Sequence, residues 1–75
     1  MKVKIKYNYS KLLGRLAEYG LNRDKFADEI GIKRTSLYKR LESKVEFKQS
    51  EIQRAILVLE LTNSDIPEYF FTLDV

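Results

Sequence analysis

The chain has 75 residues, of which 44% are hydrophobic and 33% charged, and its formal net charge is +3. This length and composition predict one folded domain with a single small core rather than a disordered chain. Cysteine and histidine are absent, which excludes disulfides, thiolate or imidazole metal sites and imidazole catalysis, so we expect no catalytic residue, metal or cofactor.

Residues 2–9, KVKIKYNY, alternate between apolar and polar side chains. The apolar side of this pattern consists of Val3, Ile5, Tyr7 and Tyr9. Such alternation is typical of a half-buried strand. The other segment of extended character is the tail, residues 70–75, so the two ends could pair within one chain or between chains. The alternative is that residues 1–9 form a basic, disordered arm.

A first helix is predicted from about Ser10 to Tyr19, with Gly20 as its stop. Its inward side would consist of Leu12, Leu13, Leu16 and Ala17. Either Asn22 or Asp24 can then cap the start of a second helix by accepting hydrogen bonds from its first amides.

Residues 23–42 have the spacing of a helix-turn-helix. Ala27 is small enough to let the two helices approach closely, and Gly31 can adopt a positive φ at the bend. Apolar residues four apart give each helix an inward stripe. These pairs are Phe26 with Ile30 and Leu37 with Leu41. An ordinary αα-hairpin is the alternative, because such spacings occur in many helical proteins.

The outward side of the second helix in this pair is polar and basic. Opposite Leu37 and Leu41, the helix face is centred on Thr35 and Lys39, while Arg34 stands at the helix start, where recognition helices contact bases. Residues 33–44 carry five basic side chains against one acid, whereas residues 60–75 carry four acids and no base. The pattern favours contact with DNA, and a merely solvated charged face is the alternative.

A fourth helix is predicted after Phe47, with Ser50 and Gln53 at capping-box spacing. Its main apolar stripe consists of Ile52, Ala55, Ile56 and Leu59. Leu57, Val58 and Leu61 lie on other sides, so the helix needs more than one neighbour. It is either simply the central core helix or a core helix with one side against a second subunit. The apolar run 55–59 is too short to cross a bilayer, and we expect no membrane association.

Asn63, Ser64 and Asp65 predict the start of a last short helix. Pro67 suits its first turn, where the missing amide donor is harmless. An aromatic cluster follows, made of Tyr69, Phe70 and Phe71. Such aromatics either close the core or contact a second subunit.

Five helical segments, with the helix-turn-helix second and third, resemble the lambda-repressor-like family of phage and bacterial regulators, which includes the Cro proteins. The strings YNYSKLLGRL, FADEIGIKRTSLYKRLESKVEFKQSEI and DIPEYFF resemble a group of small phage-encoded Cro-like regulators. The resemblance covers about residues 10–71 and implies a mainly α, five-helix DNA-binding domain, with short terminal β-strands as an open alternative. The chain departs from the family at Glu42 and Ser43, where Asn-Gly often precedes a basic residue.

The resemblance also implies a set of DNA contacts. Arg23 matches a residue that clamps phosphate at the start of the second helix. Base-facing positions are matched by Lys33, Arg34, Thr35 and Lys39, and positions near the DNA backbone by Ser36 and Lys44. With Tyr38 on the flank of the outward face, the predicted DNA-binding residues are Arg23, Lys33, Arg34, Thr35, Ser36, Tyr38, Lys39 and Lys44.

The sequence therefore favours a cytoplasmic transcriptional regulator, a Cro-like repressor that binds a palindromic DNA operator as a homodimer. Two copies are expected because one small DNA-binding domain contacts too few bases to select an operator. The candidate dimer residues are Leu57, Leu61, Tyr69, Phe70 and Phe71. The alternative is an antirepressor or co-repressor, whose acidic, aromatic C-terminal half binds another repressor protein. An enzyme is least favoured, because no glycine-rich phosphate loop and no converging carboxylate pair is present.

Overall fold

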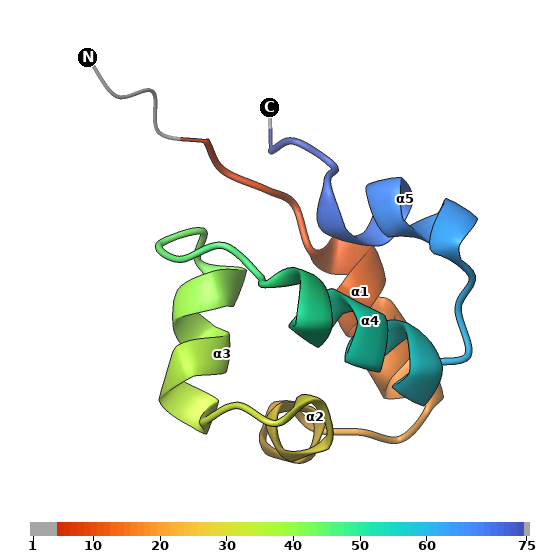
Figure 1. Cartoon of the computed structure of the whole chain (residues 1–75). Coiled ribbons are helices and arrows are strands. Elements are labelled where there is room, and N and C mark those ends of the chain that lie inside the picture. The colour runs from red at the N-terminus through yellow and green to blue at the C-terminus, as the bar shows by residue number, and fades with distance from the viewer. Residues whose placement is uncertain (1–4, 75) are drawn as a thin grey trace.

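The computed structural model describes residues 5–74, which form five α-helices joined by short connections (Figure 1). The helices are α1 (Ser10–Glu18), α2 (Arg23–Ile30), α3 (Arg34–Leu41), α4 (Gln49–Val58) and α5 (Ile66–Phe70), with the 3₁₀ turn η1 (Asn63–Asp65) before α5. The prediction of a mainly α fold with five helices is confirmed. Within this part of the chain, no helix is long and apolar enough to span a bilayer.

The core lies where α2 packs against α3 and α4, and where α1 packs against α5. Its buried apolar members are Tyr9, Leu12, Leu16, Phe26, Ala27, Ile30, Leu37, Ile52, Ala55, Ile56, Leu59 and Phe70. The stripes predicted for α2 and α4 are confirmed, since those residues of both helices are buried. On α1, however, Ala17 is exposed and Leu13 is half-buried, so the inward side of that helix is narrower than its sequence predicts.

The corner between α2 and α3 has the local geometry that its sequence predicts. The Asn22 side-chain oxygen accepts a hydrogen bond from the Lys25 amide at 2.8 Å and caps α2. Gly31 ends that helix with φ 78°, and the Ile32 amide donates to the Ala27 carbonyl at 2.9 Å. In Figure 1, α2 is seen nearly along its axis while α3 lies across the view, so the two helices cross at a wide angle.

Gly31→Ala is expected to destabilise the fold by about 1–2 kcal/mol, because a Cβ is strained at this positive φ. The new atom would also lie 2.7 Å from Nη1 of Arg54, which donates to the Ile30 carbonyl. Gly14→Ala, inside α1 with open space around the new Cβ, should instead stabilise by about 0.8–1 kcal/mol. Urea unfolding of both variants tests the difference, and equal midpoints would contradict it.

The connection from α3 to α4 contains a serine in a left-handed conformation. Ser43 adopts φ 62°. It stands at the position where the lambda-repressor-like family often has the glycine of Asn-Gly. Its hydroxyl accepts a hydrogen bond from the Tyr7 amide at 2.9 Å. The turn thus forms without Asn-Gly, and its serine also holds the N-terminal segment.

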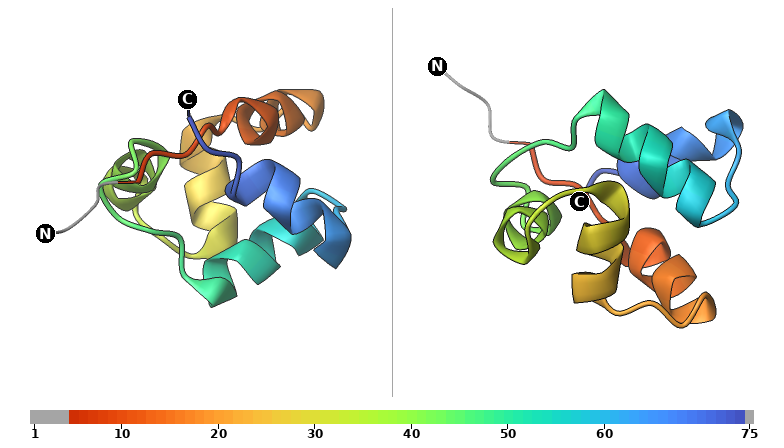
Figure 2. Two further views of the ribbon diagram at one scale, coloured as in Figure 1. Left: turned by 90° about the horizontal axis from the view of Figure 1, so that it is seen from above. Right: turned by 60° about the horizontal axis from the view of Figure 1, so that its bottom comes forward.

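The two ends of the described chain pair with each other through one antiparallel bridge, between Tyr7 and Leu73. The Asn8 amide donates to the Thr72 carbonyl at 2.7 Å, and the Asp74 amide donates to the Lys6 carbonyl at 3.0 Å. Figure 2 shows the N-terminal segment running beside both the α3–α4 connection and the segment after α5. The predicted pairing within the chain is therefore present as a bridge rather than a strand pair, and Val3 of the predicted strand lies outside the described residues.

Helix α4 follows Phe47, as predicted, but its cap differs from the predicted one. It begins at Gln49, and the Glu51 carboxylate accepts a hydrogen bond from the Lys48 amide at 3.0 Å. The predicted capping box of Ser50 and Gln53 is therefore wrong. Pro67 does lie in the first turn of α5, as predicted.

Candidate functional site

Arg40 and Glu51 form a buried ion pair that joins α3 to α4. Nε of Arg40 lies 2.7 Å from one Glu51 oxygen, and Nη2 lies 3.1 Å from the other. Arg40 is 7% exposed and Glu51 4% exposed. Arg40 is one of the five basic side chains of residues 33–44 that were expected to give α3 a basic surface, and this is corrected, because its charge is paired inside the fold.

The ionised state of Glu51 is favoured by its partners. Burial alone would raise the pKa of this carboxyl, but hydrogen bonds from Arg40 and from the Lys48 amide lower it below its ordinary value. Glu51 therefore remains a carboxylate at neutral pH and holds the Arg40 guanidinium in place.

Two arginines near the α2–α3 corner, Arg23 and Arg34, form a small surface group with Asp24 and Tyr38 that we term the α2–α3 cluster. Nε of Arg34 pairs with an Asp24 oxygen at 3.1 Å. The guanidinium carbons of Arg23 and Arg34 each lie 5.6 Å from the centroid of the Tyr38 ring. Arg34 is thus held against α2 and the Tyr38 ring instead of standing free at the start of α3.

The other residues predicted to contact DNA differ in their exposure and in their partners. Lys33, Thr35 and Lys39 are exposed, whereas Ser36 is half-buried and its carbonyl accepts a hydrogen bond from Arg40. Lys44 pairs with Glu42 at 3.2 Å. With Arg40 buried and both Arg34 and Lys44 paired with acids, the outward side of α3 presents less basic charge than its sequence indicates.

A shallow apolar depression, here termed the α4–α5 groove, lies between these two helices. It has a volume of about 360 Å³ and is lined by Gln49, Ile52, Gln53, Ile66 and Phe71. None of these lining residues is charged. Leu57, one helical turn beyond Gln53 on α4, is 79% exposed. Because residues four apart lie on the same side of a helix, Leu57 stands on the side of α4 that carries Gln53.

Aromatic rings connect the edge of this groove to the core. Phe71 meets Tyr7 with ring centroids 6.3 Å apart, and Phe70 meets Phe47 at 5.3 Å, both in edge-to-face geometry. Tyr9 packs on Phe47 at 5.5 Å, and burial, aided by Tyr7 and Glu46, raises the pKa of Tyr9 to about 12. The exposed Phe71 ring therefore packs against the Tyr7 ring.

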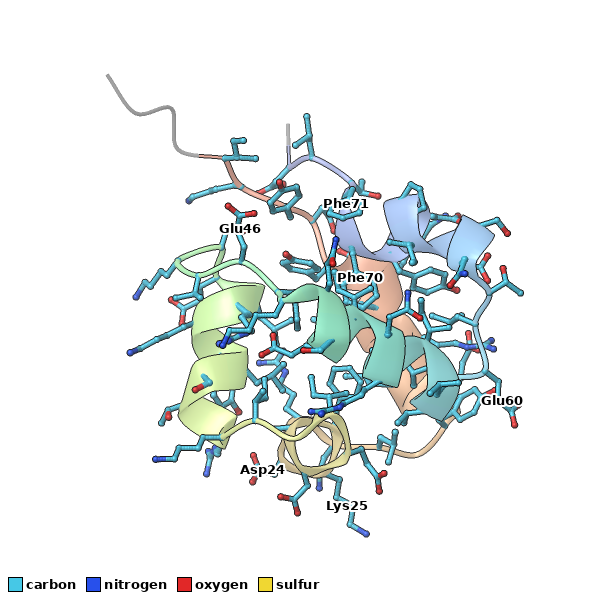
Figure 3. All side chains as sticks on the ribbon, viewed as in Figure 1. Asp24, Lys25, Glu46, Glu60, Phe70 and Phe71 are labelled. Atoms are coloured by element: carbon cyan, nitrogen blue, oxygen red, sulfur yellow. The ribbon has the colours of Figure 1, made fainter. Side chains whose placement is uncertain are left out.

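Neighbouring phenylalanines have opposite environments in this region. Phe70 is 2% exposed and Phe71 is 52% exposed, and Figure 3 shows both side chains at the end of α5. The prediction that Phe70 contacts a second subunit is corrected, because a core residue cannot reach a partner. Leu61 and Tyr69 are half-buried, so Leu57 and Phe71 are the well-exposed members of the predicted set.

The acidic side chains of the C-terminal half are largely engaged within the chain. Glu60 accepts a hydrogen bond from the Tyr19 hydroxyl at 2.8 Å, and Glu68 pairs with Lys11. Asp65 accepts bonds from the amide and hydroxyl of Thr62, which lower the pKa of its carboxyl. Within residues 5–74, no group of three such side chains could hold a metal ion.

Two features of the folded chain were not predicted from the sequence. The pairing of Arg40 with Glu51 was not predicted, although each charge stands beside a residue of the predicted apolar stripe, Leu41 on α3 and Ile52 on α4, which was a usable signal. The groove was not predicted either, because two glutamines four residues apart on a helix do not by themselves indicate a depression.

The chain is similar to a family of proteins and to a solved structure. Residues 5–73 match the model of a family described as protein of unknown function (DUF739). The chain is also similar to the solution structure of the modulator of repression (MOR) of the temperate bacteriophage TP901-1 from Lactococcus lactis. That match has 41% sequence identity and a TM-score of 0.75, and covers 88% of this chain and 89% of that chain. No curated protein matches the chain.

These findings correct the function predicted from the sequence. The similar protein is a small helical phage protein described as a modulator of repression, not as a Cro repressor. The prediction of a Cro-like, DNA-binding helix-turn-helix repressor is therefore wrong, and the palindromic operator and the homodimer that were inferred with it lose their basis. The resemblance to small phage regulators is supported only at this coarser level.

Proposed function

We propose that this chain, which belongs to the DUF739 family, binds a repressor protein and modulates its action, as an antirepressor or co-repressor. The observation that carries the proposal is the 41% identity, over 88% of the chain, to a modulator of repression. A modulator of repression must act on a repressor or on its binding, and direct contact is the simplest physical route. The proposed activity is binding, and that the chain is not an enzyme stays a prediction.

The α4–α5 groove, with Leu57, is the surface best suited to this contact. Phe71 and Leu57 expose apolar area to water, and its burial against a partner releases about 25 cal/mol per Å². The uncharged lining suits an apolar side chain of the repressor, while the amides of Gln49 and Gln53 can satisfy polar groups beside it. The acids of the C-terminal half are engaged internally, so apolar contact, rather than charge, is expected to supply most of the affinity.

Leu57→Ala and Phe71→Ala are each expected to weaken repressor binding by about tenfold, the usual effect of truncating a central apolar anchor. Isothermal titration with the repressor encoded in the same genome measures this. Val45→Ala removes an exposed apolar side chain from the α3–α4 connection and is the control, with affinity expected to change by less than about twofold. Equal losses for all three variants would contradict a contact at the groove.

The direction of the modulation is tested with the repressor bound to its own operator. If the chain is an antirepressor, adding it should release the repressor from DNA in a mobility-shift experiment. If it is a co-repressor, the repressor should bind more tightly. An unchanged repressor–DNA equilibrium, together with no heat of binding to the repressor, would overturn the proposed function.

A further inference from the structure

The α2–α3 cluster is a surface arrangement that the proposed function does not use. It joins the start of α2 to the start of α3 through the Arg34–Asp24 ion pair and through the two guanidiniums beside the Tyr38 ring. In Figure 3, Asp24 lies at the end of the molecule opposite Phe71, which borders the α4–α5 groove. The cluster is thus a second surface, separate from the groove.

The cluster holds its cations in place while leaving hydrogen-bond donors available. A guanidinium interacts with an aromatic ring through its flat face, so its N–H edges can still bind an anion. Asp24 pairs with Nε of Arg34 at 3.1 Å, and within residues 5–74 no hydrogen bond is found at the terminal nitrogens of Arg34. Because these long side chains are already ordered by contacts in the free protein, less conformational entropy is lost when a partner binds.

The charge around the cluster defines the chemistry of a partner. Arg23, Lys33, Arg34 and Lys39 are exposed cations on or beside it, and Asp24 is the acid paired with them. Carboxylates are the groups that arginine forks bind in a bidentate manner. Arginine and tyrosine are also the residue types that most often dominate binding energy at protein interfaces.

We propose that the α2–α3 cluster is a second protein-binding surface, and that it receives an acidic segment whose carboxylates bind the Arg23 and Arg34 guanidiniums. This proposal does not depend on the groove or on the identity of the repressor. The chain would then have two binding surfaces of different chemistry, one apolar and one cationic.

Two other occupants fit the cluster less well. DNA binding requires several cations to neutralise phosphates along the backbone, but Arg40 is buried and Lys44 is paired with Glu42. A second copy of the chain would have to offer its acidic C-terminal half, where Glu60 and Glu68 already have partners in their own chain. A separate acidic protein segment is therefore favoured.

The test uses the full-length, isotope-labelled protein and a short blocked alanine-rich helical peptide with glutamates four residues apart. We expect this peptide to shift the side-chain Nε–H resonances of Arg23 and Arg34. Arg23→Gln and Arg34→Gln should each weaken its binding about tenfold, as expected for loss of a charge-assisted hydrogen bond. Lys25→Gln removes an exposed charge from the same helix as Arg23 and should change binding by less than about twofold.

Variants of Tyr38 distinguish the positioning of the guanidiniums by the ring from the effect of their charge alone. Tyr38→Phe keeps the ring and should retain peptide affinity, whereas Tyr38→Leu should weaken binding several-fold without changing the net charge. Thermal midpoints show that each variant is folded. The proposal is overturned if Lys25→Gln weakens binding as much as Arg34→Gln, or if a peptide with glutamine for glutamate binds equally well. Tighter binding of a mixed-sequence DNA duplex through the same resonances, or concentration-dependent self-association through them, would also overturn it.

Discussion

Replacing Arg40 with methionine is expected to destabilise the fold by about 3–5 kcal/mol, the usual effect of removing one partner of a buried ion pair. The Glu51 carboxylate is 4% exposed and would lose both of its bonds to the guanidinium. The remaining hydrogen bond, from the Lys48 amide at 3.0 Å, cannot offset the desolvation of an ion. A domain of this size has a total stability of about 5–15 kcal/mol, so the variant should be close to unfolding.

Lys39→Met is the matched control for this prediction. It removes the same charge from the adjacent position of α3, where the side chain is exposed, and should change stability by less than about 0.5 kcal/mol. Urea unfolding, followed by circular dichroism, gives both values. A similar, small effect for Arg40→Met would mean that the ion pair does not hold α3 to α4.

The same pair makes stability depend on pH on the acidic side. The pKa of Glu51 is lower in the folded protein than its ordinary value of 4.5, so the unfolded chain binds more protons as the pH falls below that value. The stability contributed by Glu51 is therefore fully present at neutral pH and is lost as the pH falls through its folded pKa. Glu51→Gln should show a shallower loss of stability on acidification, and parallel curves for the two proteins would contradict this assignment.

Phe70→Ala is expected to destabilise the fold by about 3–5 kcal/mol, because it leaves a cavity in the core. The Phe70 ring is 2% exposed and packs edge-to-face on Phe47, with ring centroids 5.3 Å apart. It closes the core at the point where α5 meets α4 and the α3–α4 connection. Truncation would remove apolar burial and the aromatic contact together.

Phe71→Ala is the internal comparison, because it removes the same atoms at the next residue. Its side chain is 52% exposed, so we expect a loss of about 1 kcal/mol or less. Thermal unfolding measures stability, and titration with the repressor measures binding. Phe70→Ala should act mainly on stability and Phe71→Ala mainly on binding. The reverse pattern would show that the two rings have been assigned the wrong roles.

Several local features of the fold could be predicted from particular residues. The Asn22 cap, the bend at Gly31 and the position of Pro67 each depend on backbone geometry within about one helical turn, and all three are confirmed. The buried stripe of α4 was also predictable, because apolar periodicity indicates which side of a helix leaves water. These features need no knowledge of which distant segments come together.

The roles of individual side chains were less predictable where their environment depends on a distant partner. On α3, Arg40 and Lys39 carry the same charge at adjacent positions, yet Arg40 is buried because it pairs with Glu51 of α4. The groove likewise exists because α5 lies beside Gln49 and Gln53 of α4. The spacing of residues 23–42 correctly predicted a pair of helices but not their action, since such a corner packs the same way whether its outer surface meets DNA or a protein.

The sequence by itself thus determined the five helices, the cap of α2 and most of the apolar sides that form the core, because propensity, capping and periodicity act over a few neighbouring residues. Only the tertiary structure decided which charges stay at the surface, which of Phe70 and Phe71 faces solvent, and how Tyr7 comes to pair with Leu73. Those outcomes depend on contacts between segments far apart in the chain. Burial of a charge or a ring is set by the neighbours that the fold brings to it, and not by its own sequence position.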